Sequence, residues 1–198
     1  MKKTGLAMDL DDTIANTTDE WIKEASLRLN KELHKEEIIE YHINEILDMD
    51  RESVSAIYRK VWETPDSIKL VDRRIPRIIE DLKEFYEVFI ITATIGRREN
   101  ILKWLGSQGI AYDRFIMVEH ARNKTELGGD LGVSVFVDDN PNVAKFVLEE
   151  GKGIVMPKQP WNAKFIDSNT SNRLFPVSDW EEARIVLEGL AGNQWAHA

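Results

Sequence analysis

The sequence predicts an α/β protein: a parallel sheet with helices on both faces, and an all-helical insert after the first strand. From residue 75 onward, short apolar runs alternate with amphipathic helical stretches, as in strand–helix–strand units of a parallel sheet. Between the first apolar run, Gly5–Met8, and residue 75, only helical patterns occur. We therefore expect a core of residues 1–14 and 75–198 and a helical insert of residues 15–74.

Three helices are expected in the insert. A capping-box pattern at Thr17–Glu20 predicts the start of the first, and the second covers roughly Glu36–Leu47. Asp12 fits either a helix-start residue favoured by the helix dipole or a further acid of a site. Pro65 ends the third helix. That helix has an apolar stripe of Val54, Ile57, Tyr58, Val61 and Trp62.

The expected core alternates strands and helices. Strands are expected at Val88–Thr92, Phe115–Val118, Val133–Val137 and Gly153–Met156. Helices are expected at Ile75–Leu82, at Glu99–Leu105, after the Asn140-Pro141 cap, and from a second capping box at Ser178–Glu181. A loop at 159–162 contains Trp161 and Asn162, which either serve function or hold the loop in place.

Composition narrows the class of protein. Hydrophobic residues at 42% and charged residues at 31% are typical of a globular chain that buries a core. The net charge of -9 disfavours long nucleic acids and anionic membrane surfaces as partners. With no cysteine, disulfides and thiolate metal sites are excluded, and we expect a cytoplasmic protein. No apolar stretch approaches the ~20 residues that span a bilayer, and the start is too short for a signal-peptide core.

Polar side chains follow three of the expected strands. Asp9 and Asp11 come after the first strand, Thr92 ends the second, and Asp138 with Asp139 follows a later one. Because the carboxyl ends of parallel strands share one edge of the sheet, we expect these side chains to meet there. Clustered carboxylates repel one another unless a cation lies between them, and oxygen ligands without His or Cys suit Mg²⁺.

This set of groups matches the needs of phosphoryl transfer. Asp9 can supply the nucleophile, since carboxylates form phosphoenzymes, and Asp11 can give a proton to the leaving oxygen. Thr92 can hydrogen-bond a phosphate oxygen and Lys124, between the motifs, can neutralise it. The paired acids at 138 and 139 can complete the Mg²⁺ shell.

Four segments, LAMDLDDT, FIIT, RNKT and VFVDDNP, resemble the four motifs of the haloacid dehalogenase superfamily of phosphatases, in the same order. The resemblance implies a Rossmann-like core and a C1-type helical cap over the active site. It implies an Mg²⁺-dependent phosphomonoester hydrolase, a phosphatase that forms an aspartyl-phosphate.

The resemblance also assigns roles to single residues. Asp9 would be the nucleophile and a metal ligand, and Asp11 the acid/base and a metal ligand through its backbone carbonyl. Phosphate would be bound by Thr92, the adjacent Ala93 and Lys124. Either Asp138 or Asp139 would be the direct metal ligand.

The insert, the RNKT and VDDNP segments and the QPWN loop look like the 5'-nucleotidases related to the 5'(3')-deoxyribonucleotidases. That subgroup usually has Ser-Pro after its second-motif Thr, whereas Ala93 and Thr94 stand here; Thr94 offers a replacement hydroxyl. A nucleoside 5'-monophosphate is therefore the expected substrate. Another small phosphomonoester, such as a sugar phosphate or phosphoglycolate, or a polynucleotide end is the alternative. The oligomeric state stays open, with a homodimer among the options.

Two further readings differ in class. A dehalogenase needs neither Mg²⁺ nor an acid two residues after its nucleophile, so Asp11 disfavours it. A non-catalytic nucleotide-binding protein would be expected to lose Asp9. For substrate contacts in the insert, Tyr41 and His42 interrupt a helical run and are expected to face the cleft. Tyr58 and Trp62 lie on the apolar stripe and are expected to pack between helices.

Overall fold

In the computed structural model, which describes residues 3–192, six parallel strands form one sheet in the order β3-β2-β1-β4-β5-β6. The ends of the expected core, residues 1–2 and 193–198, lie outside the described residues. The sheet order reverses at β1, which pairs with β2 on one side and β4 on the other, and ligands bind at such switch points. The strands are β1 (Thr4–Met8), β2 (Tyr86–Thr92), β3 (Arg114–Met117), β4 (Val133–Val137), β5 (Gly153–Pro157) and β6 (Leu174–Val177).

Helices cover both faces of the sheet, because successive strand residues point to opposite sides and both sides are apolar. On one face pack α3 (Ile75–Leu82), α4 (Arg98–Ser107) and α8 (Trp180–Gly192). On the other pack α5 (Ala121–Asp130), α6 (Pro141–Glu149) and α7 (Ala163–Ser168). The predicted α/β fold is confirmed. Three of these elements were not predicted from the sequence: the helix α5, and the short α7 and β6.

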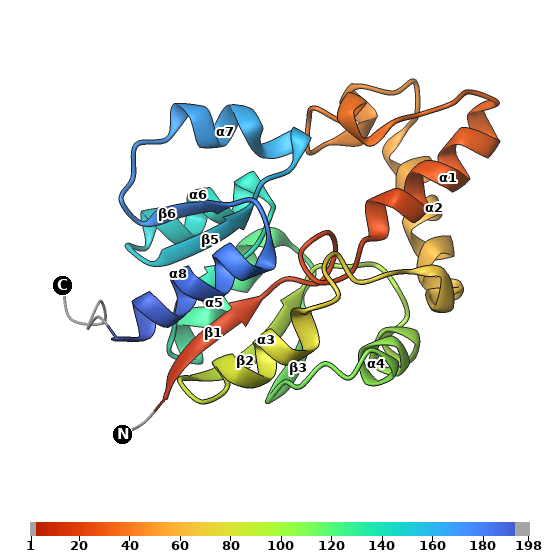
Figure 1. Cartoon of the computed structure of the whole chain (residues 1–198). Coiled ribbons are helices and arrows are strands. Elements are labelled where there is room, and N and C mark those ends of the chain that lie inside the picture. The colour runs from red at the N-terminus through yellow and green to blue at the C-terminus, as the bar shows by residue number, and fades with distance from the viewer. Residues whose placement is uncertain (1–2, 193–198) are drawn as a thin grey trace.

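Residues 15–74 lie beyond the carboxyl end of β1, where α1 and α2 run side by side (Figure 1). The prediction of a helix over Glu36–Leu47 is wrong, because this stretch holds two 3-10 turns. Ile38 and Ile43 are buried, whereas Ile39, which a helix would place on the same face as Ile43, is 47% exposed, so the buried apolar residues do not follow a helical face. The elements are α1 (Thr17–Leu29), η1 (Lys35–Glu37), η2 (Ile43–Glu45), α2 (Arg51–Glu63) and η3 (Pro65–Ser67).

The first helix of this segment, α1, is capped by a residue that lies outside the predicted capping box. The expected capping box at Thr17–Glu20 is wrong, because the helix starts at Thr17 and Asn16 makes no side-chain cap. Instead the buried Asp12 carboxylate accepts the backbone N–H of Thr18 at 3.0 Å and its hydroxyl at 2.5 Å. Asp12 has a φ of 54°, a left-handed conformation that aspartate tolerates. Asp12 thus turns the chain from β1 into α1.

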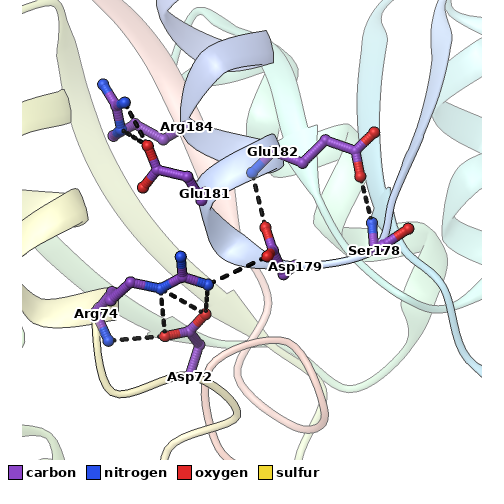
Figure 2. A network of polar contacts seen from close by, with 7 residues as sticks. All are labelled: Asp72, Arg74, Ser178, Asp179, Glu181, Glu182 and Arg184. Carbon is purple, nitrogen blue, oxygen red and sulfur yellow. Dashed lines mark hydrogen bonds and ion pairs between the residues drawn. The ribbon is translucent and has the colours of Figure 1, made fainter.

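The cap of the last helix is displaced by one residue from the predicted box. Asp179, not Ser178, accepts the backbone N–H of Glu182, and the Glu182 carboxylate accepts the backbone N–H of Ser178 at 2.7 Å (Figure 2). The start of α8 also contacts the end of the insert, where the chain returns to the sheet. Arg74 binds Asp72 and reaches Asp179 at 3.3 Å, again in Figure 2.

The two connections between the sheet and residues 15–74 lie side by side. The backbone N–H of Val71 donates to the carbonyl of Ile14 at 3.0 Å, and an antiparallel bridge joins Ala15 and Leu70. Division of the chain into core and cap at this pair of connections stays a proposal. Within the described residues, no helix is both long enough and apolar enough to cross a membrane.

Candidate active site

Three buried carboxylates meet where β1 and β4 end. The backbone N–H of Asp9 donates to the carbonyl of Val137 at 2.9 Å, which places Asp9 beside the first residues after β4. Asp9, Asp138 and Asp139 each offer an oxygen within 4.8 Å of the others, and each is less than a tenth exposed. The cluster arises because parallel pairing aligns the carboxyl ends of neighbouring strands.

Lys124, on the buried side of α5, bridges two of these carboxylates. Its Nζ lies 2.7 Å from Asp9 Oδ1 and 2.9 Å from Asp138 Oδ2, and its side chain is 3% exposed. Burial alone would lower the pKa of Lys124, but the Asp138 and Asp9 carboxylates raise it above its usual range. Lys124 is therefore a fixed cation that holds the Asp9 carboxylate in place.

Asp139 is held by neutral donors. Thr13 Oγ1 donates to its Oδ1 at 3.3 Å and Trp161 Nε1 to its Oδ2 at 2.7 Å. Within residues 3–192 no cation pairs with it. Burial, followed by the neighbouring acids Asp12 and Asp138, raises its pKa well above the usual range. Trp161 and Asn162 thus both support this residue, since Asn162 Nδ2 donates to its carbonyl at 2.9 Å.

The donor set fits a divalent cation that prefers oxygen ligands. Burial raises the pKa of Asp138 to about 7, even though Lys124 opposes that shift, so the charge of Lys124 does not neutralise the cluster. A divalent cation among the three carboxylates would remove this cost of burial. The Asp11 carboxylate does not belong to this group. Asp11 was expected to bind the metal ion through its backbone carbonyl instead.

The Asp11 carboxyl group points toward the inserted segment. Trp62 Nε1, near the end of α2, donates to Asp11 Oδ1 at 3.0 Å. Burial and the nearby Asp9 charge raise the pKa of Asp11 to about 7, while hydrogen bonds from Thr94 and Trp62 counteract the shift. A carboxyl group that titrates near neutral pH is suited to give and take a proton.

The loop after β2 supplies neutral donors. Thr92 is fully buried, and its Oγ1 accepts the backbone N–H of Thr94 at 3.1 Å. Thr92, Ala93 and Lys124 all line the cavity that contains Asp9. The Thr94 hydroxyl interacts with the Asp11 carboxyl group, so its partner is the acid two residues after Asp9.

A cavity of about 320 Å³ opens between the carboxylates and residues 15–74. Tyr41 and His42 line it. Tyr58, expected to pack between helices, has its ring 5.8 Å from that of Trp21, and it also lines the cavity. Arg51, the first residue of α2, also lines the cavity and was not predicted to do so. Its only signal in the sequence was a positive charge at the start of a helix.

Comparison with protein families identifies a match over residues 3–188, to the family described as 5' nucleotidase, deoxy (pyrimidine), cytosolic type C protein. The chain belongs to this 5'-nucleotidase family. It is accordingly a phosphatase of the haloacid dehalogenase superfamily that hydrolyses phosphomonoesters. Comparison with curated protein sequences finds no match.

Solved structures share the fold of this 5'-nucleotidase family member at low identity. A predicted phosphoglycolate phosphatase from Haemophilus somnus has a TM-score of 0.64 at 14% identity and covers 94% of this chain and 98% of its own. A haloacid dehalogenase-like hydrolase from Streptococcus pneumoniae has a TM-score of 0.67 at 13% identity and covers 93% and 98%. A protein from Bacillus subtilis, assigned to the haloacid dehalogenase-like hydrolases and solved with bound magnesium, has a TM-score of 0.57 at 13% identity. The match covers 95% of this chain and 100% of that protein.

Proposed function

We propose that the chain is an Mg²⁺-dependent nucleoside 5'-monophosphate phosphatase, with deoxyribonucleotides as its preferred substrates and Asp9 as the nucleophile. One observation carries the proposal. The Asp9 carboxylate, fixed by Lys124 among three buried acids, opens into a cavity whose far wall is formed by residues 15–74. The family to which the chain belongs, a deoxy 5' nucleotidase family, supports the choice of substrate.

The chain's residues divide the chemistry between them. Oδ1 of Asp9 is held by Lys124, so we assign the attack on phosphorus to Oδ2. As the new O–P bond forms, the bond from phosphorus to the ester oxygen breaks, and Asp11 gives that oxygen its proton. Asp11 then takes a proton from water as the water oxygen attacks the aspartyl-phosphate, which releases phosphate and restores Asp9.

Asp9, Asp138 and Asp139, with the backbone carbonyl of Asp11, would hold the metal ion. When bound, Mg²⁺ neutralises charge on the transferring phosphoryl oxygens. The hydroxyl of Thr92, the backbone of Ala93 and the Lys124 ammonium would bind the same phosphoryl group from the protein side.

The cavity suits one small substrate. Its volume of about 320 Å³ lies near the lower end of the range for small-molecule pockets, roughly 300–1,000 Å³. Aromatic side chains, Tyr41 and Tyr58, offer flat surfaces to a base, and Arg51 and Asn44 offer polar contacts. The net charge of -9 also argues against long nucleic acids.

The test is phosphate release by the purified chain with Mg²⁺, over nucleoside 5'-monophosphates, sugar phosphates and phosphoglycolate. Deoxyribonucleotides should give the highest kcat/KM, chelation should abolish release, and Asp9→Asn should be inactive. Preference for a sugar phosphate would overturn the substrate and leave the chemistry intact. Phosphate release by Asp9→Asn at the wild-type rate would overturn the nucleophile.

A further inference from the structure

Trp62 makes a contact that its apolar position does not require. Its side chain is fully buried, yet its indole N–H donates to a carboxyl group, Asp11 Oδ1, at 3.0 Å. The other indoles of the described fold that donate to the backbone include Trp21, bonded to the carbonyl of Val54, and Trp104, bonded to that of Ile68. The partner of Trp62 is instead the residue that the proposed function uses as acid and base.

Core residues fix the Trp62 indole on several sides. Its ring meets that of Trp104 edge to face, with centroids 5.9 Å apart at 90°. Asn100 Nδ2, on α4, donates to the Trp62 carbonyl at 2.8 Å. A Cβ at Gly96 would lie 2.5 Å from Trp62 Cγ, so the absence of a side chain at Gly96 makes room for the indole. These contacts fix the orientation of the indole independently of its hydrogen bond to Asp11.

The hydrogen bond selects which oxygen of Asp11 carries the proton. An indole N–H can only donate, so Oδ1 of Asp11 must be an acceptor in both protonation states. In the neutral acid, this bond favours the proton on Oδ2, because a carboxyl group accepts more strongly through its carbonyl oxygen than through its hydroxyl oxygen. Asp11 can give this proton to the leaving oxygen and recover one from water without turning its carboxyl group.

We propose that Trp62 is a positioning residue that orients Asp11 for proton transfer, and that α2 must be in place for the acid to work. The inference rests on the proposed function. Trp62 is not among the residues that line the cavity, so it acts through Asp11 and not by touching substrate. Because Trp62 belongs to residues 15–74, movement of α2 away from the sheet breaks the bond.

The role predicts dependence on the leaving group. A nucleoside 5'-monophosphate releases an alkoxide and needs the proton, whereas p-nitrophenyl phosphate releases a stable phenolate and needs it far less. Trp62→Phe keeps the ring and removes the N–H. The readout is kcat/KM, which reports formation of the aspartyl-phosphate and not its hydrolysis, the step that is the same for both esters. We expect kcat/KM to fall ~10- to 100-fold on a deoxyribonucleoside 5'-monophosphate, the cost of a misplaced catalytic group, and less than ~3-fold on p-nitrophenyl phosphate.

Trp104→Phe is the matched control, because it also removes one indole N–H and keeps an aromatic ring. Its losses on the two esters should be equal. If Trp62→Phe also loses equally on both, or on neither, the positioning role is wrong while the proposed function stands. A wild-type chain inactive on both esters with Mg²⁺ overturns both.

A second measurement is independent of turnover and of the stability of Trp62→Phe. In ¹H–¹⁵N spectra, the indole resonance of Trp62 should move upfield in Asp11→Ala, because its acceptor is gone, while that of Trp104 stays in place. A Trp62 resonance unchanged by Asp11→Ala would show that no such bond exists and would overturn the inference.

Discussion

Replacement of Lys124 by methionine should destabilise the metal-free protein severely. The ammonium group lies 2.7 Å from Asp9 and 2.9 Å from Asp138, and its side chain and both carboxylates are at most 8% exposed. Methionine keeps most of the apolar stem and removes the charge. Removal of one partner of a buried ion pair typically costs about 3–5 kcal/mol, because the other partner is left buried and uncompensated. For a chain of this size, that corresponds to a fall in Tm of roughly 6–20 °C.

The pH dependence of this loss follows from the raised pKa of Asp138, about 7, which reflects burial. A carboxyl group whose pKa is raised by folding stabilises the fold while it is neutral, and that contribution disappears as pH rises from about 4 to about 7. At about pH 5 Asp138 is mostly neutral, so Lys124→Met should lose less than about half of what it loses at about pH 8.

Urea unfolding of the chelated protein at the two pH values measures both quantities. Lys23→Met is the control, since its ion pair with Glu20 is exposed on the lysine side and should cost less than about 1 kcal/mol. Saturating Mg²⁺ should restore part of the stability of Lys124→Met, because it compensates the same carboxylates. A chelated Lys124→Met variant as stable as wild type at about pH 8 would refute the argument.

Three further outcomes are expected. Mg²⁺ should raise the Tm of the wild type more at about pH 8 than at about pH 5, because burial raises the pKa of Asp138 to about 7 and leaves this proposed metal ligand charged only at the higher pH; a Tm gain independent of pH would contradict this. Trp161→Phe should weaken Mg²⁺ binding in calorimetry by roughly 10- to 100-fold, since Asp139 loses its 2.7 Å donor; unchanged affinity would assign Trp161 to the loop alone. Gly96→Ala should lower Tm and nucleotide turnover, since its Cβ would lie 2.5 Å from Trp62 Cγ, whereas Gly106→Ala, in α4 with nothing within 4 Å, should lower neither; equal losses in the two would contradict the close packing at Gly96.

Local patterns predicted every strand of the sheet except β6, because each of the others is a short apolar run bounded by turns or acids. The helix at Ile75–Leu82 and the strands β1, β2, β4 and β5 follow such patterns. The helix predicted over Glu36–Leu47 was wrong, since Ile38 and Ile43 are buried while Ile39, on the helical face of Ile43, is exposed, and spacing alone does not show which of these residues the fold buries. The cap of α1 failed for a related reason: its acceptor, Asp12, precedes the helix by five residues and reaches it through a turn with positive φ.

The sequence by itself determined that Asp9, Thr92 and the Asp138–Asp139 pair would meet, because parallel strands must end at a common edge. Lys124 was added to them only by its place between the motifs. Only the tertiary structure decided how these groups are held. Lys124 bridges Asp9 and Asp138, Trp161 binds Asp139, and Trp62 binds Asp11. An apolar stripe tells which face of a helix is buried, but it does not tell which polar group an indole N–H will find across that interface.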